Sequence, residues 1–267
     1  MVNSFLFIIP AIPKKFSDIH RVGLQDLCIS HLISQTYSKW EVLWISENAP
    51  NTSDKRFIHI DYEGPKEEKL QVATKYIIDN NISADYIIRL DDDDLFNTKI
   101  LNEIKGATFD VTVDKHQSFW MYGTNYFASR VWYWFPNTCI HKKEHALAIY
   151  GVLANGDVKQ LNSKVRLIEN DHSKIHRYYI GKQIRFSLKN NPIYLRTITS
   201  NSVTYNNSND KESYYSKFGN WKQKSFDQFN IPHSLKKPPF NQSINQKLNN
   251  SKNDFIANVK YQKIVFE

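Results

Sequence analysis

Four consecutive aspartates, Asp91 to Asp94, follow a run of residues with the composition of a buried strand. If the chain stays extended, Asp91 and Asp93 point to the same side. Two carboxylates on one side suit a hard divalent cation such as Mg2+ or Mn2+, which prefers oxygen ligands. Such a cation would bridge phosphate oxygens and stabilise a diphosphate leaving group. The alternative is an acidic helix start, in which Asp94 caps the first turn.

Basic side chains near the aspartates are candidates for diphosphate contacts. Arg89 lies two residues before Asp91, so its guanidinium could pair with the aspartates or with phosphate. The alternative for Arg89 is a buried ion pair that fixes the end of the strand. Lys69, on a predicted helix before the strand, is a second phosphate candidate.

Glu144 is a candidate general base. It follows two lysines and precedes a histidine, and positive neighbours favour the ionised carboxylate. The alternative is a residue on a helix surface that pairs with the charges beside it. The aromatic segment 120–135 could line a sugar-binding cleft, because aromatic faces stack on sugar C–H surfaces. Most of its rings are expected in the core, and Trp132 and Trp134 are the expected acceptor contacts.

Strands and helices are expected to alternate in the first 90 residues. Apolar runs predict buried strands at 5–9, 41–45, 56–60 and 85–90, and helical periodicity predicts helices at 22–34 and 66–80. This order predicts an α/β fold with a mostly parallel central sheet and helices on both faces. Ligands bind at the carboxyl ends of the strands in such sheets, and the aspartates are placed there.

The chain after residue 90 is expected to differ from this alternating pattern of strands and helices. Aromatic-rich segments at 109–113, 118–124 and 126–135 predict antiparallel strands, followed by a helix at 142–150. Short strands are expected at 165–168 and 178–180, and beyond 194–198 the composition turns to Asn, Ser, Lys and Tyr. We expect a catalytic domain over residues 1–205 and an Asn/Lys-rich arm over 206–267, in which 255–266 docks back as a strand or helix.

The composition fits a folded, reducing-compartment protein. The chain has 267 residues, 41% of them hydrophobic, which supports a sizeable core and excludes disordered and collagen-like classes. Its 2 cysteines offer neither a disulfide framework nor a metal cluster. Without a recognisable signal peptide or an apolar run of about 18–20 residues, we expect a cytoplasmic protein, soluble or peripheral on the inner face of the membrane.

The formal net charge of +8 is concentrated in the arm. Residues 206–267 contain ten lysines and five acidic residues, a net of +5. A basic, aromatic arm could contact anionic lipid, whereas a solvated extension is the alternative. No nucleic-acid partner is expected, because no recognisable nucleic-acid-binding module accompanies the charge.

Three segments resemble the opening of GT-A glycosyltransferases. These are SQTY at 34–37, WEVLWI at 40–45 and YIIRLDDDD at 86–94. With YLRTITSN at 194–201, the RLDxDD form is similar to the bacterial putative rhamnosyltransferase family. The resemblance covers about residues 3–205. It implies the GT-A nucleotide-diphospho-sugar transferase fold, a nucleotide-sugar donor, Mn2+ or Mg2+ as cofactor, and inversion at the anomeric carbon.

The resemblance also implies roles for individual residues. Glu47 stands near the position of an aspartate that contacts the nucleotide base, and Arg196 lies in the segment expected at the substrate. Further donor contacts are expected from Pro10, Lys69, Arg89, Asp91 and Asp92. The cluster at 169–176 falls where these enzymes carry a late base, so Asp171 is the first-choice base and Glu144 its rival. His172 or His176 would complete the metal shell of Asp91 and Asp93, or contact the diphosphate.

The leading interpretation is an inverting, metal-dependent transferase. It would move a sugar, rhamnose being one candidate, to a glycan or lipid-linked acceptor in surface polysaccharide or glycolipid synthesis. One alternative is a nucleotidyltransferase, although the segment after the first strand lacks the glycines of a phosphate loop. Another is a non-catalytic module that binds glycans or nucleotide-sugars.

Overall fold

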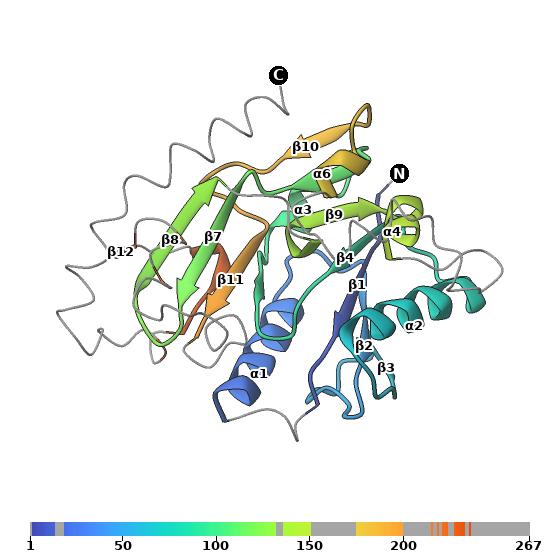
Figure 1. Ribbon diagram of the computed structural model, residues 1–267, viewed down its shortest axis with the longest axis horizontal. Helices are drawn as coiled ribbons and strands as arrows, with labels where there is room; N and C mark the ends of the chain where they lie inside the picture. The colour runs from blue at the N-terminus through green and yellow to red at the C-terminus, as the bar shows by residue number, and fades with distance from the viewer. Residues whose placement is uncertain are drawn as a thin grey trace.

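The computed structural model describes residues 2–13, 19–131, 136–150 and 175–199, together with residues 215, 218, 221–223, 227–232 and 235. These residues form two β-sheets with helices packed against them (Figure 1). Within this part of the chain, no helix has the length and apolar character needed to cross a bilayer.

The larger sheet has seven strands in the order β10-β6-β9-β4-β1-β2-β3. Its pairings are parallel except those of β9 with β4 and β6, so the expected mostly parallel sheet is confirmed. The strands span β1 (Phe5–Pro10), β2 (Trp40–Ile45), β3 (Phe57–Ile60), β4 (Tyr86–Arg89), β6 (Val111–Val113), β9 (Cys139–Lys142) and β10 (Ile184–Phe186).

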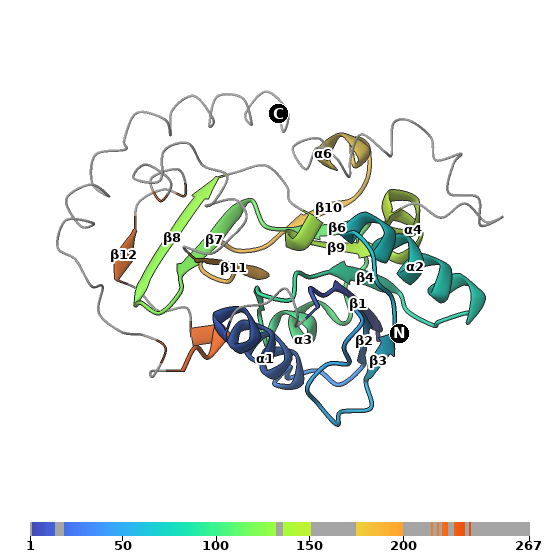
Figure 2. The same cartoon turned by 60° about the horizontal axis from the view of Figure 1, so that its bottom comes forward.

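Helices cover both faces of this sheet (Figure 2). One face carries α1 (Ile19–Ile33) and α3 (Ile100–Ile104), and the other carries α2 (Lys66–Asp79), α4 (Lys143–Tyr150) and α6 (Ile175–Tyr178). Strand β1 explains why both faces need cover. Phe7 and Ile9 enter the core on the α1 side, and Leu6 and Ile8 enter the core on the α2 side. Because β1 is buried on both faces, its sequence is a continuous apolar run and does not alternate between apolar and polar residues.

The smaller sheet lies beside α1 and has the strand order β12-β8-β7-β11-β5. Leu24 and Leu27 of α1 pack against its Trp120 and Leu195, so α1 is shared between the two sheets. The elements are β5 (Leu95–Phe96), β7 (His116–Met121), β8 (Tyr126–Val131), β11 (Tyr194–Ile198) and β12 (Lys222–Gln223), with 3-10 turns η2 (Pro136–Thr138) and η6 (Asp227–Phe229).

One expectation about the later chain is corrected. Residues 178–180 do not form a strand: α6 ends at Tyr178, and a turn follows in which Gly181 adopts a φ of 79°. The domain boundary expected at residue 205 stays a prediction, and some residues after it are packed. Phe218 and Trp221 pack on one face of the smaller sheet, and Phe229 packs with Trp120 in the core on the α1 side. The segments expected at 165–168 and 255–266 lie outside the described residues.

Candidate active site

The four aspartates lie at the carboxyl edge of the larger sheet, where β4 ends and the chain turns. The Asp94 amide donates to the Asp91 carbonyl over 3.2 Å, so the segment is a turn and not a continued strand. Asp91 and Asp93 remain partly exposed, whereas Asp92 and Asp94 are buried. The turn therefore divides identical side chains into two environments.

Asp92 connects three segments of the chain through its side chain. It is 1% exposed, and its Oδ2 accepts from the Ile12 amide at 2.9 Å and from Gln25 Nε2 at 2.6 Å. Its Oδ1 is paired with Arg21 of α1. These contacts tie the end of β1, helix α1 and the turn together. These contacts engage and shield both carboxylate oxygens, and the donor contact expected of Asp92 stays a prediction.

Asp94 fixes strand β11 beside the turn. Its side chain accepts from the Tyr194 hydroxyl and, at 2.7 Å, from the Thr197 amide. Burial and the charges of Asp93 and Asp91 raise the pKa of Asp94 well above its usual value. Since Arg196 lies between these two contact residues, Asp94 holds Arg196 close to the aspartates, and the capping role considered for Asp94 is replaced by this link.

The two exposed aspartates are paired with cations from different elements. Asp91 contacts Lys66, the first residue of α2, and lies 4.0 Å from Arg89. Although burial raises the pKa of Asp91, the charges of Lys66 and Arg89 outweigh it and hold the pKa well below its usual range. Asp93 Oδ2 accepts from Arg21 at 2.6 Å.

Asp93 is less well compensated. Burial and the charges of Asp92 and Asp91 raise the pKa of Asp93 to about 6, although Arg21 opposes the shift. Crowded carboxylates of this kind are stabilised by a divalent cation, which binds through one or two carboxylates together with substrate phosphates. The oxygen donors of Asp91 and Asp93 therefore fit Mg2+ or Mn2+.

Further cations surround the turn. Arg89 is 5% exposed, and its Nε has no hydrogen-bond partner among the described residues. Lys69 donates to the Ala11 carbonyl at 2.6 Å, and burial lowers its pKa. The charge of Arg196 lowers the pKa of Asp94, which opposes the larger effect of burial. Of the sequence candidates, Lys69, Arg89 and Arg196 thus lie with the aspartates.

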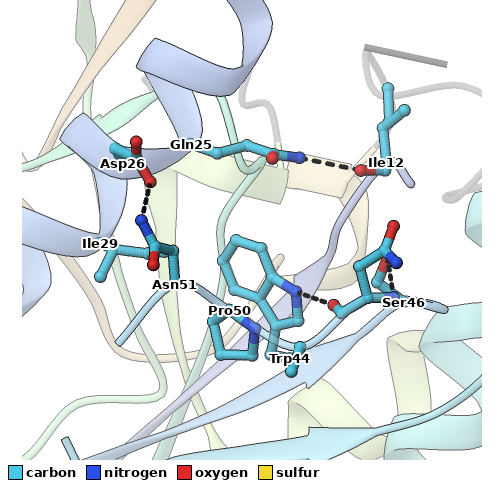
Figure 3. Close-up of a pocket in the computed structure, with 10 residues that line it drawn as sticks. Ile12, Gln25, Asp26, Ile29, Trp44, Ser46, Pro50 and Asn51 are labelled. Atoms are coloured by element: carbon cyan, nitrogen blue, oxygen red, sulfur yellow. Dashed lines mark hydrogen bonds between the residues drawn. The ribbon is translucent and has the colours of Figure 1, made fainter. Parts of the chain in front are cut away.

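A small pocket opens at the carboxyl ends of β1 and β2 (Figure 3). Trp44 lies in it, and its indole N–H donates to the Asn48 carbonyl at 3.2 Å. Gln25 spans the pocket and the aspartate turn, because it donates both to the Ile12 carbonyl and to Asp92. Ten residues line the pocket: Ile12, Gln25, Asp26, Ile29, Trp44, Ser46, Asn48, Ala49, Pro50 and Asn51.

Two sequence candidates border this pocket. Pro10 is the last residue of β1 and pairs with Ile45, the last residue of β2. Glu47 falls between the pocket residues Ser46 and Asn48. Its charge acts on Lys69, which places the two side chains within electrostatic range. Both candidates are therefore at the same edge of the sheet as the aspartates.

Glu144 lies at the opposite end of β4. Lys142 pairs with Tyr86, at the start of β4, so the beginning of α4 is remote from the turn that follows Arg89. Glu144 is 62% exposed and pairs with Lys142 at 3.0 Å. The exposure and the pair with Lys142 fit the alternative of a helix-surface residue, and the role of Glu144 as a base stays a prediction. Asp171, His172, Trp132 and Trp134 lie outside the described residues.

Glu144 belongs instead to a cluster at that far edge. Its carboxylate, Asp110 and His145 bring their ligand atoms within 4.8 Å of one another. His145 Nε2 lies 3.2 Å from Asp110, and Asp110 also accepts from the Gln183 amide at 2.8 Å. These contacts within the described residues account for the arrangement as an ion-paired surface group.

The sequence interpretation missed Arg21, Gln25 and Lys66. Arg21 and Gln25 are one turn apart on α1 and continue the face that carries Cys28, which is buried. Polar residues on the apolar face of a predicted helix were a signal for a buried polar network. Lys66 gave no comparable signal, because a lysine at a helix start is usually solvated.

No protein-family model matches the chain, and no curated protein matches it either. Among solved structures it is similar to S. aureus TarS 1-349 in complex with UDP-GlcNAc, with 12% identity, a TM-score of 0.43, and coverage of 80% of this chain and 64% of that one. It is also similar to the glycosyltransferase GlyE of Streptococcus pneumoniae TIGR4, with 11% identity, a TM-score of 0.41 and coverage of 91% and 66%.

A third similar structure is the full S. aureus TarS. Its identity is 13% and its TM-score 0.44, and the overlap covers 96% of this chain but 49% of that one. The chain thus spans between half and two thirds of the length of these proteins. Overlaps with TM-scores below 0.5 assign no activity to this chain, so its function has to be inferred from the site.

Proposed function

We propose that this chain is a GT-A glycosyltransferase that transfers a sugar from a nucleotide-diphosphate sugar to an acceptor hydroxyl. The observation that carries the proposal is the pair of partly exposed carboxylates, Asp91 and Asp93, at the carboxyl edge of a mostly parallel sheet. Basic side chains surround the pair, and a pocket adjoins it. This combination suits an anionic, metal-bound leaving group attached to a flat base.

The donor would lie across β1, β2 and β4. The nucleotide base would enter the pocket beside Trp44, where the loop after β2 offers Ser46, Glu47 and Asn48 for polar contacts. The diphosphate would face Arg89 and Arg196, whose charges favour the leaving group as it departs. UDP and UDP-GlcNAc, which are bound in structures of TarS, are practical first probes.

A bound Mn2+ or Mg2+, held by Asp91 and Asp93, would supply Lewis-acid stabilisation of the diphosphate. In the proposed inverting reaction the acceptor oxygen forms a bond to the anomeric carbon as the bond from that carbon to the diphosphate oxygen breaks. Asp171 is the proposed base for the acceptor proton, and His172 a further proposed metal or diphosphate contact. Rhamnose is one candidate sugar.

Acceptor binding is the least constrained part of the proposal. We assign the acceptor contacts to Trp132 and Trp134, and expect a hydroxyl of a glycan or a lipid-linked glycan. The net charge of +5 over residues 206–267 supports a peripheral contact with anionic lipid at the inner face of the membrane. Together these features favour a role in surface polysaccharide or glycolipid synthesis.

Substitution of Asp93 tests the proposal directly. Wild-type protein should hydrolyse a nucleotide-sugar in the presence of Mn2+, whereas Asp93→Ala should be inactive yet folded. The variant keeps the Arg21–Asp92 pair and loses a repelled carboxylate, so its melting temperature in metal-free buffer should hold or rise. Asp79→Ala, which removes an exposed aspartate on α2, is the matched control. Near-normal turnover by Asp93→Ala would rule out the metal–diphosphate site.

A further inference from the structure

The ammonium of Lys66 is paired with Asp91, one of the two carboxylates assigned to the metal. Lys66 is the first residue of α2, and its ammonium contacts Asp91 Oδ1. The lysine side chain is 36% exposed and the aspartate 25% exposed. Within the described part of the chain, this ion pair is the interaction that holds the ammonium.

The other cations at the turn are fixed more firmly. Arg21 forms two charged hydrogen bonds, one to Asp92 and one to Asp93. Lys69 is 4% exposed and donates to a backbone carbonyl. Arg89 projects from the buried strand β4. Lys66 therefore differs in being more exposed than these cations, at the start of a helix, and attached through a single pair.

The Lys66–Asp91 pair is partly exposed, so solvent and incoming ions can reach both charges. Fully exposed pairs contribute roughly 0–1 kcal/mol to stability, and a single partly exposed pair can be exchanged for another charged contact. The lysine stem has four rotatable carbons, so the ammonium can swing several ångströms without moving the helix. Loss of its Asp91 contact would be compensated once another anion came within reach.

A divalent cation bound to Asp91 would repel the Lys66 ammonium on the same carboxylate, since both are positive and close together. A nucleotide diphosphate brings the required second anion to the same place. We propose that Lys66 is an exchangeable counter-ion, which neutralises Asp91 in the donor-free protein and passes to the donor diphosphate when metal and donor bind. The inference rests on the proposed function and adds a residue to the diphosphate site.

The exchange makes the two ligands depend on each other. Metal alone must displace the ammonium and leave it without an anion, so its affinity is reduced. With UDP present, the displaced ammonium gains a charged hydrogen bond to phosphate, so metal and nucleotide favour each other's binding. Removal of the ammonium should therefore shift the two affinities in opposite directions.

Lys66→Met tests the exchange by calorimetry with Mn2+ alone and with UDP in saturating Mn2+. Mn2+ alone should bind roughly two- to fivefold more tightly, as expected for loss of a competing, partly exposed ion pair. UDP should bind about tenfold or more weakly, because one charged phosphate contact is lost. Lys75→Met, which breaks the exposed pair with Asp79 on the same helix, should change neither affinity.

Lys66→Arg, which keeps the charge, should retain most of the wild-type UDP affinity, and unchanged melting temperatures would show that all variants fold. If the two affinities of Lys66→Met move together, or if either stays at the wild-type value, the exchange is overturned. Failure of the proposed function itself looks different: the wild-type protein would then bind neither Mn2+ nor UDP.

Discussion

Four identical residues in a row have different roles here because burial and partners differ at each position. Asp92 is enclosed by donors from β1 and α1, and Asp94 is enclosed by β11. Asp91 and Asp93 are partly exposed and pair with Lys66 and Arg21. The alternation expected from an extended chain is present, although the backbone turns. The residue pattern could not show that the buried Asp92 and Asp94 position the partly exposed Asp91 and Asp93.

Substitution of the proposed base separates donor binding from chemistry. Asp171→Asn should keep the affinity for a nucleotide-sugar and Mn2+ while transfer slows about 10²–10⁴-fold, the usual effect of removing a general base. Glu144→Gln should leave the transfer rate unchanged, because Glu144 lies at the far end of β4 and points to solvent. The measurements are kcat for transfer and donor affinity by calorimetry. An active Asp171→Asn would mean that another group accepts the proton.

At the scale of elements, strand β11 joins the two sheets at the site. Its first residues are held from the larger sheet by Asp114, which follows β6 and accepts from the amides of Ile193, at 2.9 Å, and Tyr194, at 3.1 Å. Asp94 holds the middle of the strand through the Thr197 amide. Two buried carboxylates thus fix the strand that carries Arg196, so the position of this cation depends on both.

Asp114 should make stability depend on pH. Burial raises its pKa to about 7, although hydrogen bonds from Ile193, Ser187 and Tyr194 oppose the shift. The unfolded value is about 3.9, so the native state binds the extra proton between these pH values. Stability should therefore fall as pH rises from about 4 to about 7, by up to roughly 1.4 kcal/mol per unit, and level off above.

Asp114→Asn should remove this contribution, because the amide does not titrate. The free energy of unfolding of both proteins is measured with denaturant between pH 5 and pH 8. The change with pH is compared, so a difference that is the same at every pH, caused by altered hydrogen bonding, does not matter. Parallel stability curves would show instead that the three donors keep Asp114 ionised throughout.

Local sequence patterns predicted the strands and helices of the first 90 residues, which surround the aspartate turn. The strands β1, β2, β3 and β4 and the helices α1 and α2 were expected within a few residues of their observed bounds, because continuous apolar runs and helical spacing are properties of short segments. Strand β9 was missed because its Cys139–Lys142 sequence is short and lacks alternation. The neighbours of Glu144 in sequence could not show which end of β4 it lies at, because that depends on the pairing of β9 with β4.

Contacts between distant segments were beyond local prediction. Asp94 and Thr197 are separated by 103 positions, and Asp114 and Ile193 by 79. Lys66 and Asp91 meet only because α2 returns the chain across the sheet. The sequence therefore predicted a candidate metal–diphosphate site through the aspartates, but not the cations and buried carboxylates that surround them.

At the scale of the whole molecule, the later chain completes the hydrophobic cores around the smaller sheet. Phe229 and Ile231 pack with Trp120 and Leu195, and the Phe229 carbonyl also contacts His31 of α1. Phe218 and Trp221 cover the opposite face. Since α1 also holds Asp92 through Arg21, these residues support the aspartate turn indirectly.

Two truncations test this organisation. A chain ending at Leu235 should retain the wild-type melting temperature and donor hydrolysis, since the buried aromatics and the aspartate site are kept. A chain ending at residue 205 should lose cooperative unfolding and hydrolysis. It lacks Phe218, Trp221 and Phe229, and each large buried aromatic contributes about 3–5 kcal/mol, against a total stability of about 5–15 kcal/mol. Near-UV circular dichroism and thermal melting measure packing independently of activity. A 1–205 chain that melts like the full protein would support a domain boundary at residue 205. It would also show that the later aromatics are not needed for the domain to fold.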